Sequence, residues 1–318
     1  MKLPRRLTDL GRWLDRRKSK SVLRIKGYDR YLAANHPKRA LLSYLPGPVK
    51  DQMAGGSSLH FSNYGIAVTF PKVLNKLGYI VDVINWDDTS FEPEDLYDLV
   101  IFHGGHNFTQ LKPRLLGYPV IIYFSTGTYW KNHNGCEKKR FKDFRRRHGT
   151  ELPPDRFIDS SEEAPVRAAN GIISLGDLRV AATYPLCTKV LPLNNASYVE
   201  GSIPTGKIFA TARDNFLFFA GNGNVHKGLD ILIDAFLGLT AKHLYVATNL
   251  ERRFLDVYRP KLADSANIHL LGRLKLGSAK FMALVDTCAF VVLASCSEGS
   301  PGSVVDAMHH GLIPVLSR

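Results

Sequence analysis

The sequence has few cysteines and no long apolar run. No stretch approaches the roughly 20 apolar residues that a membrane-spanning helix needs, and the basic start lacks the apolar core of a signal peptide. We therefore expect a protein of the cytoplasm with free thiols. None of the cysteines forms a C-x-x-C pair, which excludes the common signatures of zinc ribbons and dithiol redox sites. The four are Cys136, Cys187, Cys288 and Cys296.

Basic residues are abundant but unevenly distributed. The formal net charge is +13: residues 1–39 carry +10, residues 137–147 carry +5, and the rest of the chain carries about −2. Leucines at helical spacing among arginines predict a basic amphipathic helix in the first patch. The patches favour docking on an anionic membrane surface, on the inner face of the cell membrane. The alternative is ordinary solvated helices. Nucleic acid is not an expected partner, because no nucleic-acid-binding motif accompanies the patches.

Length and hydrophobic pattern set the fold class. A chain of 318 residues with 45% apolar residues is long enough for two ordinary domains of about 100–200 residues each. Short continuous apolar runs alternate with helix-like segments, and such runs indicate strands buried on both faces of a mostly parallel sheet. The predicted strands of the first half are 40–45, 80–84, 99–102, 120–124, 171–175 and 189–193.

A second series of the same kind follows residues 194–214, which lack periodicity and indicate a linker. We expect an α/β fold of two Rossmann-like, doubly wound domains with a cleft between them, and ligands at the carboxyl ends of the strands. The predicted parts are a basic segment 1–38, a first domain 39–200 and a second domain 201–318. The predicted strands of the second domain are 216–220, 243–247, 267–271, 289–293 and 312–316.

A glycine-rich turn, residues 221–228, follows a predicted strand and precedes a predicted helix. Its spacing is not that of a P-loop, nor that of the dinucleotide fingerprint, because His226 stands where the latter needs glycine. Gly221 and Gly223 still let the backbone approach a ligand, and Lys227 offers a charge for a phosphate. The alternative is a glycine turn with a solvated lysine.

Two carboxylates follow a later predicted strand. Glu298 lies in a loop, and Asp306 lies roughly one and a half to two turns into the next helix. Carboxylates accept hydrogen bonds from sugar hydroxyls, while the N–H groups of Gly302, Ser303 and Val304 at the helix start suit a phosphate. Alternatively, the two acids are a helix-dipole partner and a surface charge.

Three segments together resemble the donor-binding domain of the retaining glycosyltransferases of family 4, which have the GT-B fold. They read FLFFAGNGNVHKGLDILIDAF, NIHLLGRL and SEGSPGSVVDAMHHGLIPV, and they cover most of residues 216–316. The resemblance implies that Glu298 contacts hydroxyls of the donor sugar, Asp306 the nucleotide ribose and Lys227 the donor diphosphate.

The sequence departs from the family at two of these positions. Asp306 stands where the family usually has glutamate, and Asn222 stands where it has an arginine. Arg273 and Arg213 are the candidates for supplying the missing positive charge.

The first half resembles the family more loosely. Gly55 and Gly56 resemble a glycine-rich loop that closes over the donor phosphates. His103 ends a predicted strand, as does the family's histidine that faces the transferred sugar, and this position favours a catalytic role over a capped loop histidine. Ser125 stands where many members have another histidine. No third ligand accompanies His103 and His106, so no metal is expected.

The resemblance implies an enzyme that moves a sugar from a nucleotide-sugar donor to a hydroxyl, with retention at the anomeric carbon. The expected acceptor is a glycan or a lipid-linked molecule of envelope polysaccharide synthesis, and no cofactor is needed. Alternatives are a nucleotide-sugar epimerase or phosphorylase of the same fold, or a degenerate nucleotide-sugar-binding protein. Because the family continues through a further strand and helix beyond the position of Arg318, the resemblance also implies an incomplete second domain.

Overall fold

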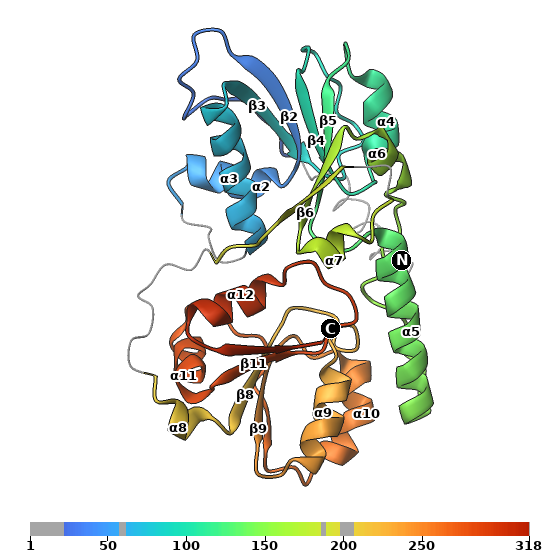
Figure 1. Ribbon diagram of the computed structural model, residues 1–318, viewed down its shortest axis with the longest axis vertical. Coiled ribbons are helices and arrows are strands. Elements are labelled where there is room, and N and C mark those ends of the chain that lie inside the picture. Colours follow the sequence, from blue (N-terminus) through green and yellow to red (C-terminus); the bar gives the residue numbers. More distant parts are fainter. Residues whose placement is uncertain (1–21, 57–61, 186–188, 198–206, 318) are drawn as a thin grey trace, which may run out of the picture. The chain divides into compact units, whose positions relative to one another are not determined.

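The computed structural model describes residues 22–56, 62–185, 189–197 and 207–317 (Figure 1). The chain forms two compact units, one of residues 1–57 and 67–121 and one of residues 58–66 and 122–318. This grouping by contacts is a different division from the predicted domains 39–200 and 201–318, which stay a prediction. The predicted basic helix near the amino terminus lies in residues 1–21, outside the described residues.

Four strands of the first unit run in the order β1-β3-β2-β4. Strand β2 (Lys38–Tyr44) pairs in parallel with β3 (Tyr79–Asn85) and with β4 (Leu99–His103), while β1 (Ile25–Tyr28) pairs antiparallel with β3. Residues 40–44 of β2 are all buried, as expected for a strand that is covered on both faces. The helices along this part of the chain are α2 (Pro46–Met53), α3 (Ser62–Lys76), α4 (Phe108–Leu111) and the 3-10 helix η1 (Lys112–Arg114).

The second unit contains strand pairs of the first half and a parallel sheet of the second half. Strand β5 (Val120–Ser125) pairs with β6 (Gly171–Leu175), and β6 pairs with β7 (Val190–Leu193). The parallel five-stranded sheet has the order β10-β9-β8-β11-β12. Because the chain starts at β8 and winds outward in both directions, the order reverses between β8 and β11, where doubly wound folds bind ligands. The strands are β8 (Asn215–Phe219), β9 (His243–Ala247), β10 (Ile268–Leu270), β11 (Phe290–Leu293) and β12 (Ile313–Leu316).

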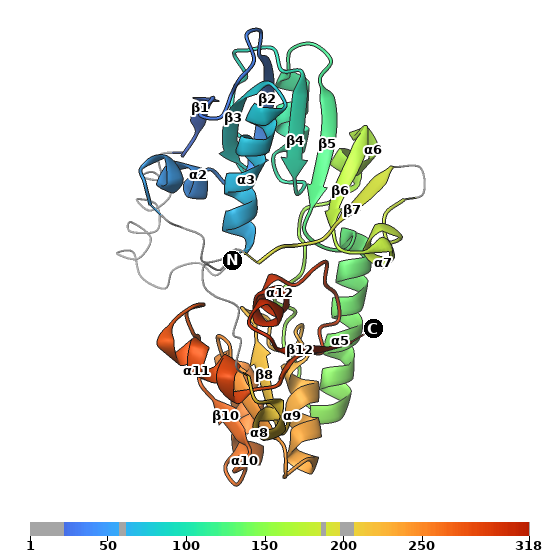
Figure 2. The same ribbon diagram turned by 60° about the vertical axis from the view of Figure 1, so that its left-hand side comes forward.

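A long helix of the first half packs on this five-stranded sheet. Helix α5 (Trp130–His148) lies beside α9 (Leu229–Gly238) in both views (Figures 1 and 2). Its Phe141 and Phe144 belong to the same buried cluster as side chains of β8 to β11 and of α10. Arg147 of α5 forms ion pairs with Asp230 and Asp234 of α9. The remaining helices of the unit are α6 (Glu163–Ala168), α7 (Leu178–Ala181), α8 (Phe209–Ala212), α10 (Arg252–Leu262), α11 (Ala279–Thr287) and α12 (Gly302–His309).

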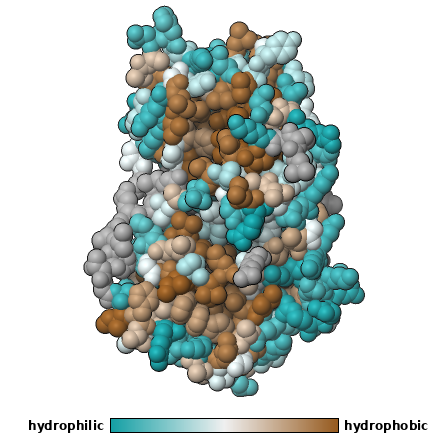
Figure 3. Space-filling model, in the orientation of Figure 1, coloured by the Kyte–Doolittle hydropathy of each residue, from teal (hydrophilic) through white to brown (hydrophobic). Residues whose placement is uncertain are grey.

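The other face of α5 is a basic surface. The right-hand side of the molecule along α5 is hydrophilic in Figure 3. Among the residues that the structure describes, no helix has both the length and the apolar composition to cross a bilayer. The exposed cations of this face are Lys138, Lys139, Lys142, Arg145 and Arg146.

Candidate functional site

Two loops meet at the point where the strand order reverses. The β8–α9 loop, residues 220–228, and the β11–α12 loop, residues 294–301, follow adjacent parallel strands. Gly228 has φ +76°, and a Cβ there would lie 2.1 Å from the carbonyl oxygen of Ala294. Only glycine fits this position, because the left-handed conformation and the close backbone contact both exclude a side chain. The amide of Cys296 also donates to the carbonyl of His226, at 2.9 Å.

Lys227 and Glu298 form an ion pair across these two loops. The ammonium of Lys227 donates a hydrogen bond to the carboxylate of Glu298. Their side chains are 14% and 22% exposed, so the pair is shielded but reachable. Burial alone would raise the pKa of Glu298, but the charge and hydrogen bond of Lys227 prevail and hold that pKa below its usual value. The predicted sugar-binding acid is therefore ionised and held beside the predicted phosphate-binding cation.

A pocket of about 340 Å³ lies against Glu298. Its walls come from the β11–α12 loop and from residues that follow β5 and β6. Thr128 and Ser297, which both line it, share a hydrogen bond of 2.7 Å between their hydroxyls. Gly299 fits against the turns after β5 and β6 only because it has no Cβ, which would lie 2.4 Å from the carbonyl oxygen of Leu175. Residues of the first half thus shape the loop that carries Glu298.

Asp306 has different surroundings from Glu298. It lies in α12, is buried, and accepts a hydrogen bond of 2.8 Å from the hydroxyl of Ser197. Burial raises its pKa above the usual aspartate value, and the Ser197 hydroxyl opposes this shift only in part. At the start of α12, the amide of Val304 donates to the carbonyl of Pro301 at 3.0 Å, so one of the three amides predicted for phosphate is engaged. Helix α12 has no side-chain cap at its start, which leaves Gly302 and Ser303 as the candidates there.

A carboxylate occupies amides of the β8–α9 loop. Glu251, which directly precedes the first residue of α10, accepts hydrogen bonds from the amides of Gly223 at 2.8 Å and Asn224 at 3.2 Å. A donor phosphate at Gly223 would have to displace this carboxylate. The carbonyl of Gly221, in turn, accepts a hydrogen bond from Thr248 at 2.5 Å.

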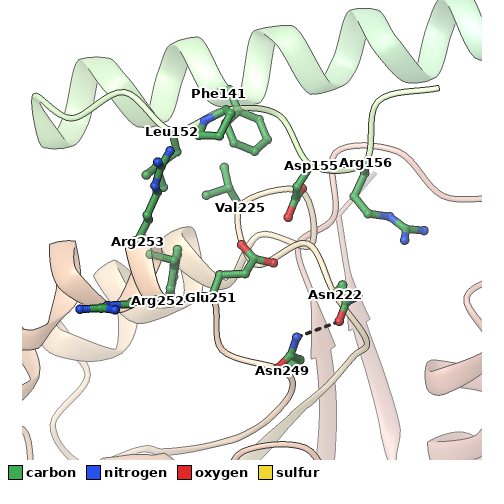
Figure 4. A pocket seen from close by; sticks show the side chains of 12 residues that line it. Phe141, Leu152, Asp155, Arg156, Asn222, Val225, Asn249, Glu251, Arg252 and Arg253 are labelled. Atoms are coloured by element: carbon green, nitrogen blue, oxygen red, sulfur yellow. Dashed lines mark hydrogen bonds between the residues drawn. The ribbon is translucent and has the colours of Figure 1, made fainter. Parts of the chain in front are cut away.

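Glu251 also lines a second pocket, of about 460 Å³, shown in Figure 4. The carboxylates of Asp155 and Glu251 point toward each other there, beside Asn222 and Val225. Burial and the neighbouring Glu251 carboxyl raise the pKa of Asp155 to about 7. Asn222, the position at which the resemblance in sequence implies an arginine, accepts a hydrogen bond of 3.1 Å from Asn249. Arg156, Arg252 and Arg253 also line this pocket, and the side chains of Arg252 and Arg253 point away from Asn222 (Figure 4).

A buried histidine and glutamate connect α5 with both loops. His226 Nδ1 lies 2.8 Å from Glu137 Oε2, and its Nε2 donates to the carbonyl of Ser297 at 3.0 Å. Burial would raise the pKa of Glu137, but hydrogen bonds from His226 and from the amide of Arg156 lower it. Burial lowers the pKa of His133, which lies one turn before Glu137. The sequence analysis did not select Glu137, although the His133–Glu137 spacing places both side chains on one helix face.

The remaining predicted residues are found as follows. Arg273 lies exposed in the segment after β10. In the first unit, His103 ends β4 as predicted, and its ring contacts those of Tyr44 and Trp86 at 5.0 and 6.4 Å between centroids. Gly55 and Gly56 donate their amides to Gln52 and Asp51 at the end of α2. These two amides thus terminate a helix, a structural use that differs from the predicted phosphate contact.

The second half of the chain matches a known family model. Residues 214–318 match the model described as "Glycosyl transferases group 1". No curated protein sequence matches the chain.

Solved structures with a similar fold have low sequence identity. The OtsA apo structure aligns with a TM-score of 0.51 and 10% identity, over 88% of this chain and 84% of that one. HepE from Anabaena, in complex with UDP and glucose, aligns with a TM-score of 0.46 and 13% identity, over 88% of this chain and 80% of that one. TarM aligns with a TM-score of 0.47 and 15% identity, over 69% of this chain and 40% of that one. The chain thus spans about two fifths of the length of TarM.

The likeness to OtsA and the sheet topology agree on the architecture. The strands are mostly parallel, helices alternate with them, and the second sheet is doubly wound, as the sequence predicts. The chain has the α/β fold of the GT-B glycosyltransferases, and its carboxyl-terminal third matches the glycosyl transferases of group 1.

Proposed function

We propose that this protein is a glycosyltransferase that moves a sugar from a nucleotide-sugar donor to a hydroxyl acceptor. The observation that carries the proposal is the Lys227–Glu298 pair. It lies on the two loops at the switch point of the second sheet, inside the segment that matches the family model, and Glu298 lines a pocket of about 340 Å³. A cation for a diphosphate and an ionised acceptor for hydroxyls are the two groups that such a donor needs.

In this mechanism Lys227 stabilises the negative charge that develops on the departing diphosphate. Preorganised charge of this kind is the largest catalytic term that the site offers, because group departure separates charge and the protein has already placed the cation. The amides of Gly302 and Ser303 assist at the start of α12. Glu298 orients the sugar by accepting hydrogen bonds from its hydroxyls.

Three finer features of the reaction follow from the resemblance in sequence. The transfer retains the anomeric configuration, with the departing phosphate helping to deprotonate the acceptor hydroxyl. His103 supports the sugar, and Asp306 contacts the ribose. Comparing the anomeric configuration of product and donor by NMR tests retention.

The test of the proposed function is a transfer assay with a Glu298→Gln variant. Donors are chosen by thermal shift among UDP, GDP, ADP and their sugars, since a ligand that binds the folded state raises the melting temperature. We expect transfer by the parent protein and its loss in the variant, with an unchanged circular dichroism spectrum. Equal turnover in the variant would remove Glu298 from the mechanism.

A second candidate is a protein that binds nucleotide sugars without transferring them. It is favoured by Asn222 in place of the arginine and by the Glu251 carboxylate on the amide of Gly223. Calorimetric binding of a donor with no turnover on a panel of glycan and lipid-linked acceptors would support it. A donor converted without any acceptor would instead indicate an epimerase.

The acceptor proposed from the charge pattern is a glycan or lipid-linked molecule at an anionic membrane. The exposed cations of α5 include Lys138, Lys142 and Arg145, whose spacing places them in one row along the helix. Co-sedimentation with vesicles that contain anionic lipid, and release by salt, tests this docking. Reversing the charge of these three residues should weaken binding to the vesicles. Unchanged binding would contradict the proposed docking.

A further inference from the structure

Within the described residues, one group of three potential metal ligands lies close together, and the proposed transfer reaction does not use it. It consists of His133 and Glu137 on α5 and His226 on the β8–α9 loop, with ligand atoms all within 4.8 Å of one another. The side chains of Glu137 and His226 are 0% and 2% exposed. The group is therefore part of the interior rather than a surface cluster of acids.

A fourth donor lies beside the group. Cys296 Sγ is 3.4 Å from His226 Nδ1. Glu137 Oε2 is 2.8 Å from His226 Nδ1 and 3.6 Å from His133 Nε2. Ligands that surround Zn²⁺ tetrahedrally at about 2.0–2.3 Å lie about 3.3–3.6 Å from one another. The separations of Glu137 from both histidines and of Cys296 from His226 are thus near tetrahedral spacing. Cys296 lies outside the three whose ligand atoms are all within 4.8 Å of one another, so its thiol would have to move toward His133 and Glu137 to complete the set.

Hydrogen bonds with backbone groups around the cluster orient two of these ligands. The Nε2–H of His226 donates to the carbonyl of Ser297 at 3.0 Å, which leaves Nδ1 to face the group. Glu137 Oε1 accepts from the amides of Asp155 and Arg156, at 3.1 and 2.8 Å, which leaves Oε2 to face it. Metal-binding histidines and carboxylates are held in this way by backbone groups.

Charge balance favours an ion here. A buried Zn²⁺ bound by one carboxylate and one thiolate has no net charge, so the cost of burying the ion is offset. A donor set of nitrogen, oxygen and sulfur suits Zn²⁺ among the common divalent metals. In the structure, His133 Nε2 donates to the carbonyl of Arg156 at 2.7 Å, so binding of the ion would require the His133 tautomer with its proton on Nδ1. Binding would also release to solvent the proton between His226 and Glu137 and the thiol proton of Cys296.

We propose that His133, Glu137, His226 and Cys296 form a structural Zn²⁺ site. His226 directly precedes Lys227, and Cys296 lies two residues before Glu298. The ion would therefore fix both loops of the candidate site to α5. No metal is expected from the sequence, and this proposal departs from that expectation at residues that the sequence analysis did not consider together. The proposal does not depend on glycosyl transfer, since it is tested without donor or acceptor.

The test measures metal binding by the full chain, prepared without a polyhistidine tag and freed of metal by a chelator. Zn²⁺ is titrated in competition with a chromophoric chelator, and Co²⁺ is then used as a spectroscopic substitute. We expect one tight Zn²⁺ per chain, the ligand-field bands of tetrahedral Co²⁺, and a thiolate-to-cobalt charge-transfer band. Cys296→Ser should remove the charge-transfer band.

Ligand variants separate this site from adventitious binding. His226→Gln and Glu137→Gln should each weaken Zn²⁺ binding at least about tenfold, since even outer-shell changes commonly cost that much. The matched control is His243→Gln, because His243 Nδ1 lies 3.1 Å from His269 Nε2 in a pair that belongs to no group of three. This control should bind Zn²⁺ like the parent.

Three results would overturn the proposal. They are less than one Zn²⁺ per chain, equal affinity in all the ligand variants, and an octahedral Co²⁺ spectrum without the thiolate band. Each would identify the group as a purely hydrogen-bonded cluster. Where a variant fails to fold, as judged by circular dichroism, the Co²⁺ spectrum of the parent protein decides.

Discussion

Glu298, in the β11–α12 loop, and Asp306, in α12, are two shielded carboxylates whose pKa values are shifted in opposite directions. Glu298 faces the ammonium of Lys227, and its pKa lies below the usual value. Asp306 faces the hydroxyl of Ser197, and its pKa lies above the usual value. Burial acts in the same direction on both acids, so the neighbouring cation accounts for the opposite directions of the two pKa shifts.

This difference assigns distinct chemical tasks to the two acids. An ionised carboxylate accepts hydrogen bonds only, as the binding of sugar hydroxyls requires. An acid with a raised pKa retains its proton to higher pH and can then also donate. Before a donor arrives, the ion pair also keeps Lys227 in place, so a diphosphate finds the cation already positioned.

Removal of the cation should have the largest effect on this contrast. In Lys227→Met we expect kcat/KM for transfer to fall by about 10²–10³, the range found when one preorganised donor to a developing anion is lost. The matched control is Lys242→Met, since Lys242 also pairs with an acid, Asp214, at the start of β9. A steady-state transfer assay measures both. Similar losses in the two variants would mean that Lys227 acts only through stability.

The pH dependence of stability should differ in sign between the two acids. The lowered pKa of Glu298 means that its ionised form stabilises the fold above its unfolded pKa of about 4.3, and that this contribution is lost as pH falls through the folded pKa. Glu298→Gln should therefore lower the free energy of unfolding at pH 7 by about 1–2 kcal/mol, and the melting temperature with it. This loss of stability should become smaller in acid.

The raised pKa of Asp306 predicts the opposite profile. Its protonated form stabilises the fold below the unfolded pKa of about 3.9, and this contribution is lost as pH rises through the folded pKa. Asp306→Asn should therefore raise the melting temperature at pH 7 and have little effect in acid. The melting temperatures of both variants are measured across the pH range. Changes of the same sign in Glu298→Gln and Asp306→Asn would contradict the difference between the two acids.

The smallest effect should come from the hydroxyl of Ser197. Ser197→Ala removes one hydrogen bond to Asp306, which is worth about 1 kcal/mol and shifts the melting temperature by a few degrees at most. We expect kcat/KM for transfer to fall only severalfold, because Lys227 and Glu298 remain. A loss as large as that of Lys227→Met would show that Asp306 contributes as much to the reaction as the ion pair.

Hydrophobic pattern was sufficient to predict most of the fold. The buried parallel strands, such as β2 and β9, are continuous apolar runs, because both of their faces are covered. Strand β1 was not predicted. It is four residues long, contains Lys26 and Gly27, and pairs antiparallel at the edge of its sheet, so it carries no such run.

The candidate site was predictable only where its residues lie near one another in sequence or on adjacent strand ends. Lys227 and Glu298 were expected in one place because each follows a strand of the same parallel sheet, and the structure pairs them. The contact of Glu137 with His226 joins residues 89 positions apart. No local pattern reports such a contact, and the same holds for Glu251 on the amide of Gly223.

The central claim, that Lys227 and Glu298 hold one donor together, is tested most directly by a double-mutant cycle in donor binding. Calorimetry would measure the dissociation constant of the best nucleotide sugar for the parent chain, Lys227→Met, Glu298→Gln and the double variant. The account predicts that each single change weakens binding and that the double change costs clearly less than the two together, because the residues act on one ligand and on each other. Full additivity, or a donor that binds all four proteins equally, would contradict it.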